Sequence, residues 1–454
     1  MRLPAFSSRG WSLGTLGWRC RTLRFGSVQS GVVAALFTFA AYVVGAGRAY
    51  DYDSSETVGS FVATRSLLDP FRRQLQFNNH PLFSFLDHLV YSLGGRGELA
   101  LRVLPIAFAA VTVGVVTGWA ARRWGGVAGW TAGLVLALNP SYAVLGRSVR
   151  GYSLLTLAAV VSSLLLIELL DRDRPRLWPV YAFALAVAVA THLYALFVLV
   201  GHLAFAASRG RLDRRLLRWC ALGLALGLSA YSLLARQMVG TALHEPGRFQ
   251  PLFPERTAVA LLGTSQTAIV LLASLLVVGS SMVSTRGLLS VVAALSLTLG
   301  VVWLVVTPRD LYPRFLVWLV PAVAILVGAA TGRSRLALPL ALFAAIAMAR
   351  VDIPRWTLNP LPSEQAADLV TDTRALGDRP CVLPEVRGAL MAYTATPPEA
   401  TKLRELRGCD LSIGVPFDGR ALLAAARTTF PYHWRLGAET PYLVYSRLSK
   451  RAIG

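Results

Sequence analysis

Charged residues are scarce in this sequence. Asp, Glu, Lys and Arg make up 15% of its 454 residues, whereas soluble proteins carry roughly 25%. Apolar residues supply 55%. Apolar runs of roughly 17–25 residues, long enough to cross a bilayer, recur from residue 31 to residue 350. The composition therefore excludes an ordinary soluble enzyme and predicts a polytopic helical membrane protein.

Lysine is nearly absent. Lys402 and Lys450 are its only positions, so arginine carries almost all of the formal net charge of +21. In a soluble protein such a charge would indicate binding to nucleic acid. Here the arginines form short clusters between the apolar runs, as the positive-inside rule produces. We therefore expect membrane lipids, and no nucleic acid, among the partners.

Sequence motifs for metals and nucleotides are also missing. The four cysteines, Cys20, Cys220, Cys381 and Cys409, do not have the spacing of a metal site. No P-loop, dinucleotide-binding glycine motif or nucleophile elbow is present. Cys381 and Cys409 could form a disulfide if their segment faces an oxidising compartment, or remain buried thiols. The sequence thus predicts no metal site.

The arginine clusters predict the topology. With the basic residues 1–30 in the cytoplasm, a retained first helix at about 31–47 leads outward and places the acidic loop 48–97 outside. Cleavage of this first helix as a signal peptide is the alternative. Alternation of the later clusters completes a transmembrane domain of residues 31–350 with about eleven helices. The later helices are expected at about 98–120, 126–145, 152–170, 177–208 (two), 216–235, 257–279, 287–306, 314–331 and 336–350.

The segment 177–208 departs from simple alternation. Both flanks are strongly basic and should lie in the cytoplasm, yet the segment is too short for two full spans of about 20 residues each. We predict a hairpin of two short helices that turns near residues 191–194, where irregular backbone must line a cavity. One long buried helix is the alternative.

Composition changes after residue 350. In residues 351–454, Asp, Glu, Pro and Thr become more frequent and no apolar run is long enough to span a membrane. The apolar stretches 381–383 and 442–445 are typical of buried strands. An odd number of crossings places this segment outside. We predict a small extracytoplasmic α/β domain there.

The acidic loop carries the first candidate site. Asp53 and Glu56 are three residues apart, so on a helix they would share one face. Two neighbouring carboxylates repel, and one of them then holds its proton more tightly. That suits it to accept a proton from a hydroxyl. The alternative is a solvated loop acid, or an N-cap for a following segment at 57–68.

His80 is a second candidate in the same loop. It precedes Pro81, a good first residue for a helix at about 82–93. His80 would then point at the outer surface or serve only as the helix entry. Asp87 and His88 are expected to be ordinary interfacial residues of that helix.

Outer arginines need an explanation, because the positive-inside rule disfavours them. Arg150 and Tyr152 lie at the predicted outer start of one helix, and Arg309 and Arg314 lie around that of another. Arginine binds phosphate oxygens through two parallel hydrogen bonds, which predicts an anionic phosphate ligand. Snorkelling to lipid is the alternative. His192, at the predicted hairpin turn, either lines a cavity or is a core histidine.

Short motifs follow one another in order from residue 53 to residue 321. They are Asp53-Ser54-Ser55-Glu56, His80-Pro81, Glu98-Leu99-Ala100-Leu101-Arg102-Val103-Leu104-Pro105, Asn139-Pro140, Arg150-Gly151-Tyr152, Thr191-His192, and Arg314-Phe315-Leu316 with Pro321. Their order resembles that in the GT-C glycosyltransferases, in particular the bacterial branch related to protein mannosyltransferases and aminoarabinose transferases. The family's adjacent Asp-Glu pair is altered: Glu56 stands at the Glu position and Ser55 replaces Asp. Either Asp53 or Glu56 is therefore the acid that acts.

The resemblance implies a membrane all-α, GT-C-like fold. It also implies inverting transfer of a sugar from a polyprenyl-phosphate-linked donor to a glycan, lipid or protein acceptor at the outer face of the cytoplasmic (inner) membrane. An acid, Asp53 or Glu56, would be the base. The expected substrate-binding residues are His80, Arg150, Tyr152, His192, Arg309 and Arg314. The sequence specifies no cofactor, although some relatives use a divalent metal.

Two other functions stay open. A transporter or lipid flippase would show broken helices in both halves of the chain, and the sequence predicts one broken hairpin without a counterpart. A non-catalytic partner of a glycosyltransferase is the second alternative, since the acid motif is displaced.

Overall fold

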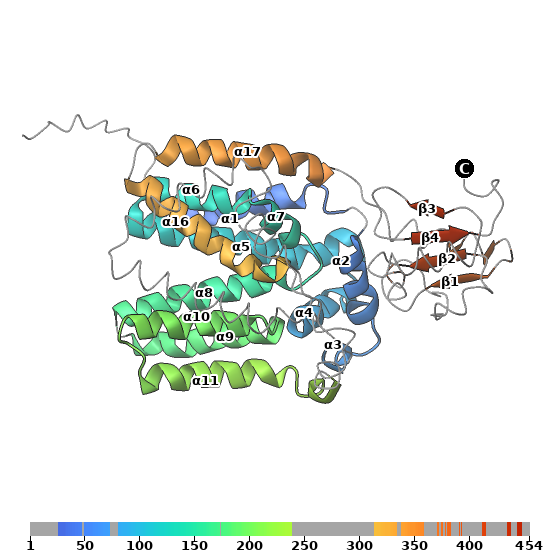
Figure 1. Ribbon diagram of the computed structural model, residues 1–454, viewed down its shortest axis with the longest axis horizontal. Coiled ribbons are helices and arrows are strands. Elements are labelled where there is room, and N and C mark those ends of the chain that lie inside the picture. Colours follow the sequence, from blue (N-terminus) through green and yellow to red (C-terminus); the bar gives the residue numbers. More distant parts are fainter. Residues whose placement is uncertain are drawn as a thin grey trace, which may run out of the picture.

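A bundle of helices, with strands beyond one end of it, forms the computed structural model (Figure 1). The structure describes residues 26–47, 50–72, 80–172, 174–237, 313–333 and 337–357, together with short segments between residues 370 and 446. The predicted helices at 257–279 and 287–306, and Arg309, lie outside these residues.

Among the residues that the structure describes, two helices are long and apolar enough to cross a membrane unaided, α5 (Glu98–Trp124) and α8 (Tyr152–Asp171). A third candidate is the pair α6 (Gly126–Ala137) and α7 (Pro140–Gly146), which is bent by 68° at the break between the two helices. Shorter helices complete the described bundle: α1 (Ser27–Val43), α9 (Trp178–Thr191), α10 (Ala195–Ser208), α11 (Arg214–Ser229), α16 (Val320–Arg333) and α17 (Ala337–Thr357).

Close contact between α1 and α5 depends on glycine. Gly114 and Gly118 lie one turn apart on α5, and Gly31 faces them from α1. A Cβ atom on Gly31 would lie 2.6 Å from the carbonyl oxygen of Gly114, and one on Gly114 would lie 2.6 Å from that of Gly31. Small residues at this spacing let membrane helices approach until their backbones touch.

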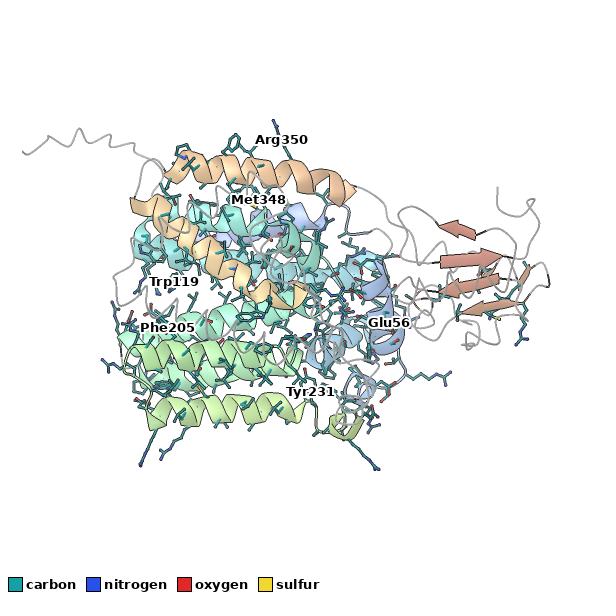
Figure 2. All side chains as sticks on the ribbon, viewed as in Figure 1. Glu56, Trp119, Phe205, Tyr231, Met348 and Arg350 are labelled. Carbon is teal, nitrogen blue, oxygen red and sulfur yellow. The ribbon has the colours of Figure 1, made fainter. Side chains whose placement is uncertain are left out.

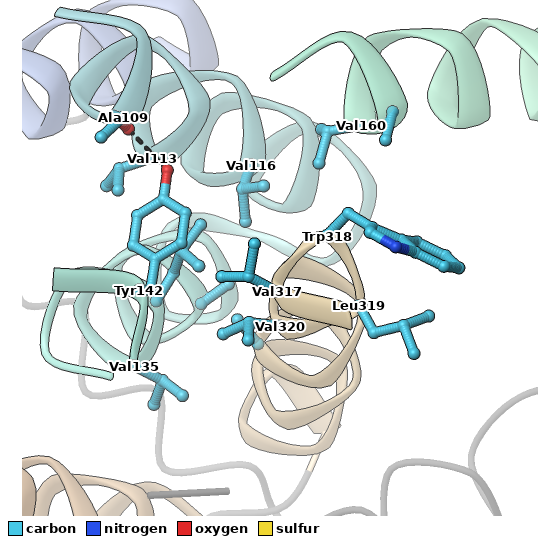
Figure 3. Packing of buried hydrophobic residues seen from close by; sticks show 14 of the residues in the cluster. Ala109, Val113, Val116, Val135, Tyr142, Val160, Val317, Trp318, Leu319 and Val320 are labelled. Carbon is cyan, nitrogen blue, oxygen red and sulfur yellow. Dashed lines mark hydrogen bonds between the residues drawn. The ribbon is translucent and has the colours of Figure 1, made fainter. Parts of the chain in front are cut away.

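The core lies where α5, α6, α7 and α8 meet the 3₁₀ turn η3 (Pro313–Leu319) and α16 (Figure 3). The hydroxyl of buried Tyr142 donates to the carbonyl of Ala109 at 2.9 Å. Val317 and Val320 belong to the same cluster. This packing fixes η3, which carries Arg314, against the N-terminal half of the bundle.

The predicted hairpin is confirmed. Helix α9 ends at Thr191 and α10 begins at Ala195. Between them His192 is extended, with φ −158° and ψ 133°. Thr191 and His192 are completely buried, so the turn lies within the protein, as irregular backbone at membrane depth requires.

Ion pairs hold the predicted cytoplasmic arginine clusters together. Arg123 and Arg209 both pair with Asp171, each at 3.1 Å. These arginines lie over the rings of Trp119 and Phe205, which Figure 2 shows at the end of the bundle away from α2 and the strands. The segments after α5, α8 and α10, which the sequence places on one side of the membrane, therefore meet at one end.

Short helices of the acidic loop cover the opposite end. Helix α2 (Tyr52–Thr57) continues into a π-helical turn, η1 (Val58–Val62), and is followed by α3 (Asp69–Arg72) and α4 (Pro81–Ser92). The first of these helices begins before the segment expected at 57–68, because Asp51 caps it. His80 is the N-cap of α4 and Pro81 its first residue, as predicted.

The interpretation of Asp87 and His88 as interfacial residues is wrong, since both are buried. The loop folds back over α4, and the His88 Nδ1 atom forms a hydrogen bond with the carbonyl of Val62 in η1 at 2.7 Å. Neither carboxylate oxygen of Asp87 has a partner among the described residues. Burial therefore raises the pKa of Asp87 well above its usual value.

Four short strands are described in the C-terminal part. They are β1 (Pro380–Val382), β2 (Leu411–Gly414), β3 (Trp434–Leu436) and β4 (Leu443–Ser446), in the order β1-β2-β4-β3. The first pair is parallel, the others antiparallel. The sequence predicted strands at the positions of β1 and β4.

One residue of the C-terminal part contacts the helical bundle. Ala392 packs against the hydrophobic cluster that contains Tyr50 and Val58 of the acidic loop.

Candidate functional site

Asp53 lies in the first turn of α2, at the end of the bundle covered by the acidic loop. The helix begins there because the Asp51 side chain accepts a hydrogen bond from the Ser54 amide at 2.7 Å, the usual N-cap arrangement. The side chain of Asp53 is 27% exposed. Its carboxylate therefore has access to solvent while the start of its helix is fixed.

Two arginines from distant segments meet Asp53. Arg150 precedes α8, and its side chain is 7% exposed with its Nη1 atom 3.6 Å from Asp53 Oδ1. Arg314 of η3 donates to the other carboxylate oxygen. Arg150 also donates to the Asp53 carbonyl at 3.3 Å. Three segments widely separated in sequence thus converge on one carboxylate, and the cluster carries one net positive charge.

Two buried histidines lie beside these arginines. The His80 ring packs edge-on against Tyr152 at 4.7 Å between centroids and tilted against His192 at 4.8 Å. The Tyr194 amide donates to His192 Nδ1 at 3.1 Å, so the proton of neutral His192 is on Nε2. Arg150 lies over the Tyr152 ring.

His80 is neutral at physiological pH. Burial is the largest cause that lowers its pKa well below the usual value, and the positive charges of Arg150 and Arg314 add to it. The Thr191 backbone acts in the opposite direction and is outweighed. Neither ring nitrogen reaches a hydrogen-bond partner in good geometry within the described part of the chain. A neutral imidazole here can donate one hydrogen bond and accept another.

Glu56 stands one turn after Asp53 on α2. Its Oε1 atom accepts a hydrogen bond from the Ser60 hydroxyl at 3.0 Å. The two acids thus lie on one helix, as their spacing predicts, and the ion pairs with Arg150 and Arg314 described above are formed by Asp53.

Gly151 is required by this packing. A Cβ atom there would lie 2.8 Å from His80 Nδ1 and 2.8 Å from Thr191 Cγ2. We expect Gly151→Ala to push the His80 ring aside and to lower thermal stability in detergent by several degrees. Gly126→Ala is the matched control, since its Cβ atom would meet nothing within 4 Å. Equal thermal stability of the two variants would refute the role of this contact.

Sequence reasoning missed the polar contacts behind Asp53. The Ser148 hydroxyl donates to Asp51 Oδ2 at 3.1 Å, and the Val149 amide donates to the Ser54 hydroxyl oxygen at 3.0 Å. Asp51 could have been found as an N-cap before a helix. Ser148 carries no such signal, because its contact is made across 97 residues.

The structure thus brings together Asp53, His80, Arg150, Tyr152, His192 and Arg314, with Glu56 nearby; Arg309 lies outside the described residues. Tyr152 is buried like both histidines, and its ring lies against His80 and under Arg150. Within the described ranges, no three His, Cys, Asp or Glu side chains lie close enough together to hold a metal ion. No described residue is assigned as a metal ligand.

Residues 78–234, about a third of the chain, match the family model for dolichyl-phosphate-mannose-protein mannosyltransferase. The match begins after Asp53 and ends before Arg314, so it covers the middle of the site. No curated protein matches the sequence significantly.

Solved structures extend the likeness. ArnT from Cupriavidus metallidurans bound to undecaprenyl phosphate has a TM-score of 0.56 and 14% identity over 92% of this chain and 98% of that one. The apo form of the same protein has a TM-score of 0.59 and 15% identity, over 91% of this chain and 96% of that one. Arabinofuranosyltransferase AftD from Mycobacteria has 0.52 and 17%, over 87% of this chain and 36% of its own. The chain therefore shares the fold of ArnT over most of its length, and its residues 78–234 are similar to the protein mannosyltransferase family.

Proposed function

We propose that this protein transfers a sugar from a polyprenyl-phosphate-linked donor to an acceptor, with inversion, at the outer face of the cytoplasmic membrane. The observation that carries the proposal is the Asp53 carboxylate held between Arg150 and Arg314. A base for the acceptor proton and cations for a phosphate leaving group are what such a displacement needs. The fold shared with ArnT, solved with undecaprenyl phosphate, supports this donor class.

Asp53 is the base in this proposal. It takes the proton of an acceptor hydroxyl or amine as the acceptor atom bonds to the anomeric carbon. The bond from that carbon to the phosphate oxygen breaks, and its electron pair leaves with the phosphate. Arg150 and Arg314 bind the charge that develops there. A single displacement inverts the anomeric carbon.

The donor phosphate competes with Asp53 for the arginines. In the structure both guanidinium groups contact the carboxylate. The donor's phosphodiester carries one negative charge, as a carboxylate does, and the phosphate gains a second charge as its bond to the sugar breaks, so it draws the arginine N–H groups away from Asp53. Asp53 is then released toward the acceptor. His80 and His192 are placed to bind uncharged parts of the donor or its phosphate by hydrogen bonds.

The outward orientation has separate support. Cys381 is in a disulfide, and disulfides persist outside the cytoplasm. Its pairing with Cys409, which lies outside the described residues, stays a prediction. The arginine clusters at the opposite end of the bundle fit a cytoplasmic face.

Lipid analysis tests the proposed function. Deleting the gene is expected to make a polyprenyl-phosphate sugar accumulate, and mass spectrometry of extracted lipids measures it. Complementation with the wild-type chain restores the normal level and the Asp53→Asn variant does not. An unchanged set of lipid-linked sugars in the deletion strain would contradict the proposal.

A further inference from the structure

Three side chains behind Asp53 form a buried polar clamp, which we define as Asp51, Ser54 and Ser148. Asp51 Oδ1 accepts the Ser54 amide at 2.7 Å, and Asp51 Oδ2 accepts the Ser148 hydroxyl at 3.1 Å. The two serine hydroxyl oxygens are 3.4 Å apart. Ser54 and Ser148 are 0% and 5% exposed. The two serines therefore lie inside the protein, and Asp51 is half-buried.

The hydrogen bonds of the clamp have one consistent direction. The Ser54 oxygen accepts the Val149 amide at 3.0 Å, so its own hydrogen is available for the Ser148 oxygen. Ser148 in turn donates to Asp51. Such a chain is cooperative, and each buried polar atom in it has a partner. Loss of one link leaves a neighbouring group unsatisfied, which costs more than the bond itself contributes.

The clamp joins the two segments that carry Asp53 and Arg150. Asp53 lies between Asp51 and Ser54, while Arg150 follows Ser148 by two residues. These segments are 94 to 97 residues apart in sequence. Since the clamp holds residues on both sides of Asp53 and the two residues before Arg150, it sets where the Asp53 carboxylate stands relative to the Arg150 guanidinium.

We propose that Asp51 and Ser148 are positioning residues that hold Asp53 and Arg150 in the geometry for sugar transfer. The proposal rests on the proposed function. Neither residue touches substrate. They act through Asp53, whose displacement by about 1 Å would cost up to roughly 100-fold in rate.

The test measures steady-state transfer by purified full-length protein, using the lipid-linked sugar that accumulates in the deletion strain as donor. Ser148→Ala and Asp51→Asn are each expected to lower kcat at least tenfold while KM for the donor changes less than threefold. Asn keeps the helix cap, so Asp51→Asn removes the link to Ser148 together with the Asp51 charge near Arg150, whereas Ser148→Ala removes the link alone. The double variant is expected to lose little more than either single variant, because both break the same link.

Ser163→Ala is the matched control, because the Ser163 hydroxyl also makes a hydrogen bond, 2.9 Å to His202 Nε2. It is expected to keep kcat within twofold. Rates are normalised to folded protein measured by thermal unfolding. A Ser148→Ala variant that loses stability but keeps kcat would overturn the positioning role and leave the proposed function intact. Absence of transfer by the wild-type protein would instead count against the proposed function.

Discussion

Replacing Asp53 by Asn is expected to lower sugar transfer by about 10²–10⁴-fold, the usual contribution of a general base. The side chain keeps its size and its place in α2, but an amide does not take the acceptor proton. The turnover number is the quantity that falls. Glu56→Gln is the matched control on the same helix, and we expect a much smaller loss because Glu56 contacts Ser60.

A measurement of donor binding distinguishes two roles for Asp53, that of a general base and that of a counter-ion for the arginines. In the structure the Asp53 carboxylate accepts a hydrogen bond from Arg314 and forms an ion pair with Arg150, so Asn at this position is expected to bind undecaprenyl phosphate as tightly as the wild type or severalfold more tightly. Native mass spectrometry or calorimetry in detergent measures this. Weaker binding by Asp53→Asn would show that the carboxylate chiefly arranges the arginines, and Asp53 would lose its role as the base.

Replacing Arg314 by Gln is the second large effect, and we expect transfer to fall about 100-fold or more. The Arg314 guanidinium contacts Asp53 and is half-buried in η3, and in the proposed reaction it binds the developing phosphate charge with reduced solvent screening. Undecaprenyl phosphate binding falls together with kcat/KM. Arg314→Lys restores little, because an ammonium group does not reproduce the two parallel hydrogen bonds of a guanidinium.

An arginine far from the site controls for the loss of positive charge. Arg122 pairs with Glu168 at 2.8 Å, and its side chain is 58% exposed. Exposed pairs of this kind contribute at most about 1 kcal/mol. Arg122→Gln is therefore expected to leave transfer and lipid binding unchanged. If Arg122→Gln lowered transfer and lipid binding as much as Arg314→Gln does, nonspecific attraction of positive charge to anionic lipid would explain both losses, and Arg314 would not form a specific phosphate site.

Local signals in the sequence predicted much of this arrangement. Basic flanks on both sides of 177–208 required an even number of crossings, and α9 and α10 form that hairpin. Pro81 marked the start of α4. The outer positions of Arg150 and Arg314 were conspicuous because the positive-inside rule disfavours them, and the structure places both beside Asp53.

Contacts between distant segments could not be predicted from the sequence. Asp87 sits on an amphipathic helix beside a membrane, where an acid is normally solvated, and only the fold of the loop over α4 buries it. Gly114 and Gly118 have the spacing at which small residues let two membrane helices pack closely. Their partner, Gly31, is identified only by the contact of α1 with α5 in the structure. The choice between Asp53 and Glu56 likewise depended on where Arg150 and Arg314 lie.

The most direct test of sugar transfer follows the bond between donor sugar and phosphate. Purified protein is incubated with the accumulated lipid-linked sugar and with membranes that supply the acceptor. We predict release of free polyprenyl phosphate together with a glycosylated acceptor, and neither product with Asp53→Asn. Recovery of the lipid-linked sugar intact from the wild-type reaction, as a flippase or a non-catalytic partner would leave it, would contradict sugar transfer by this protein.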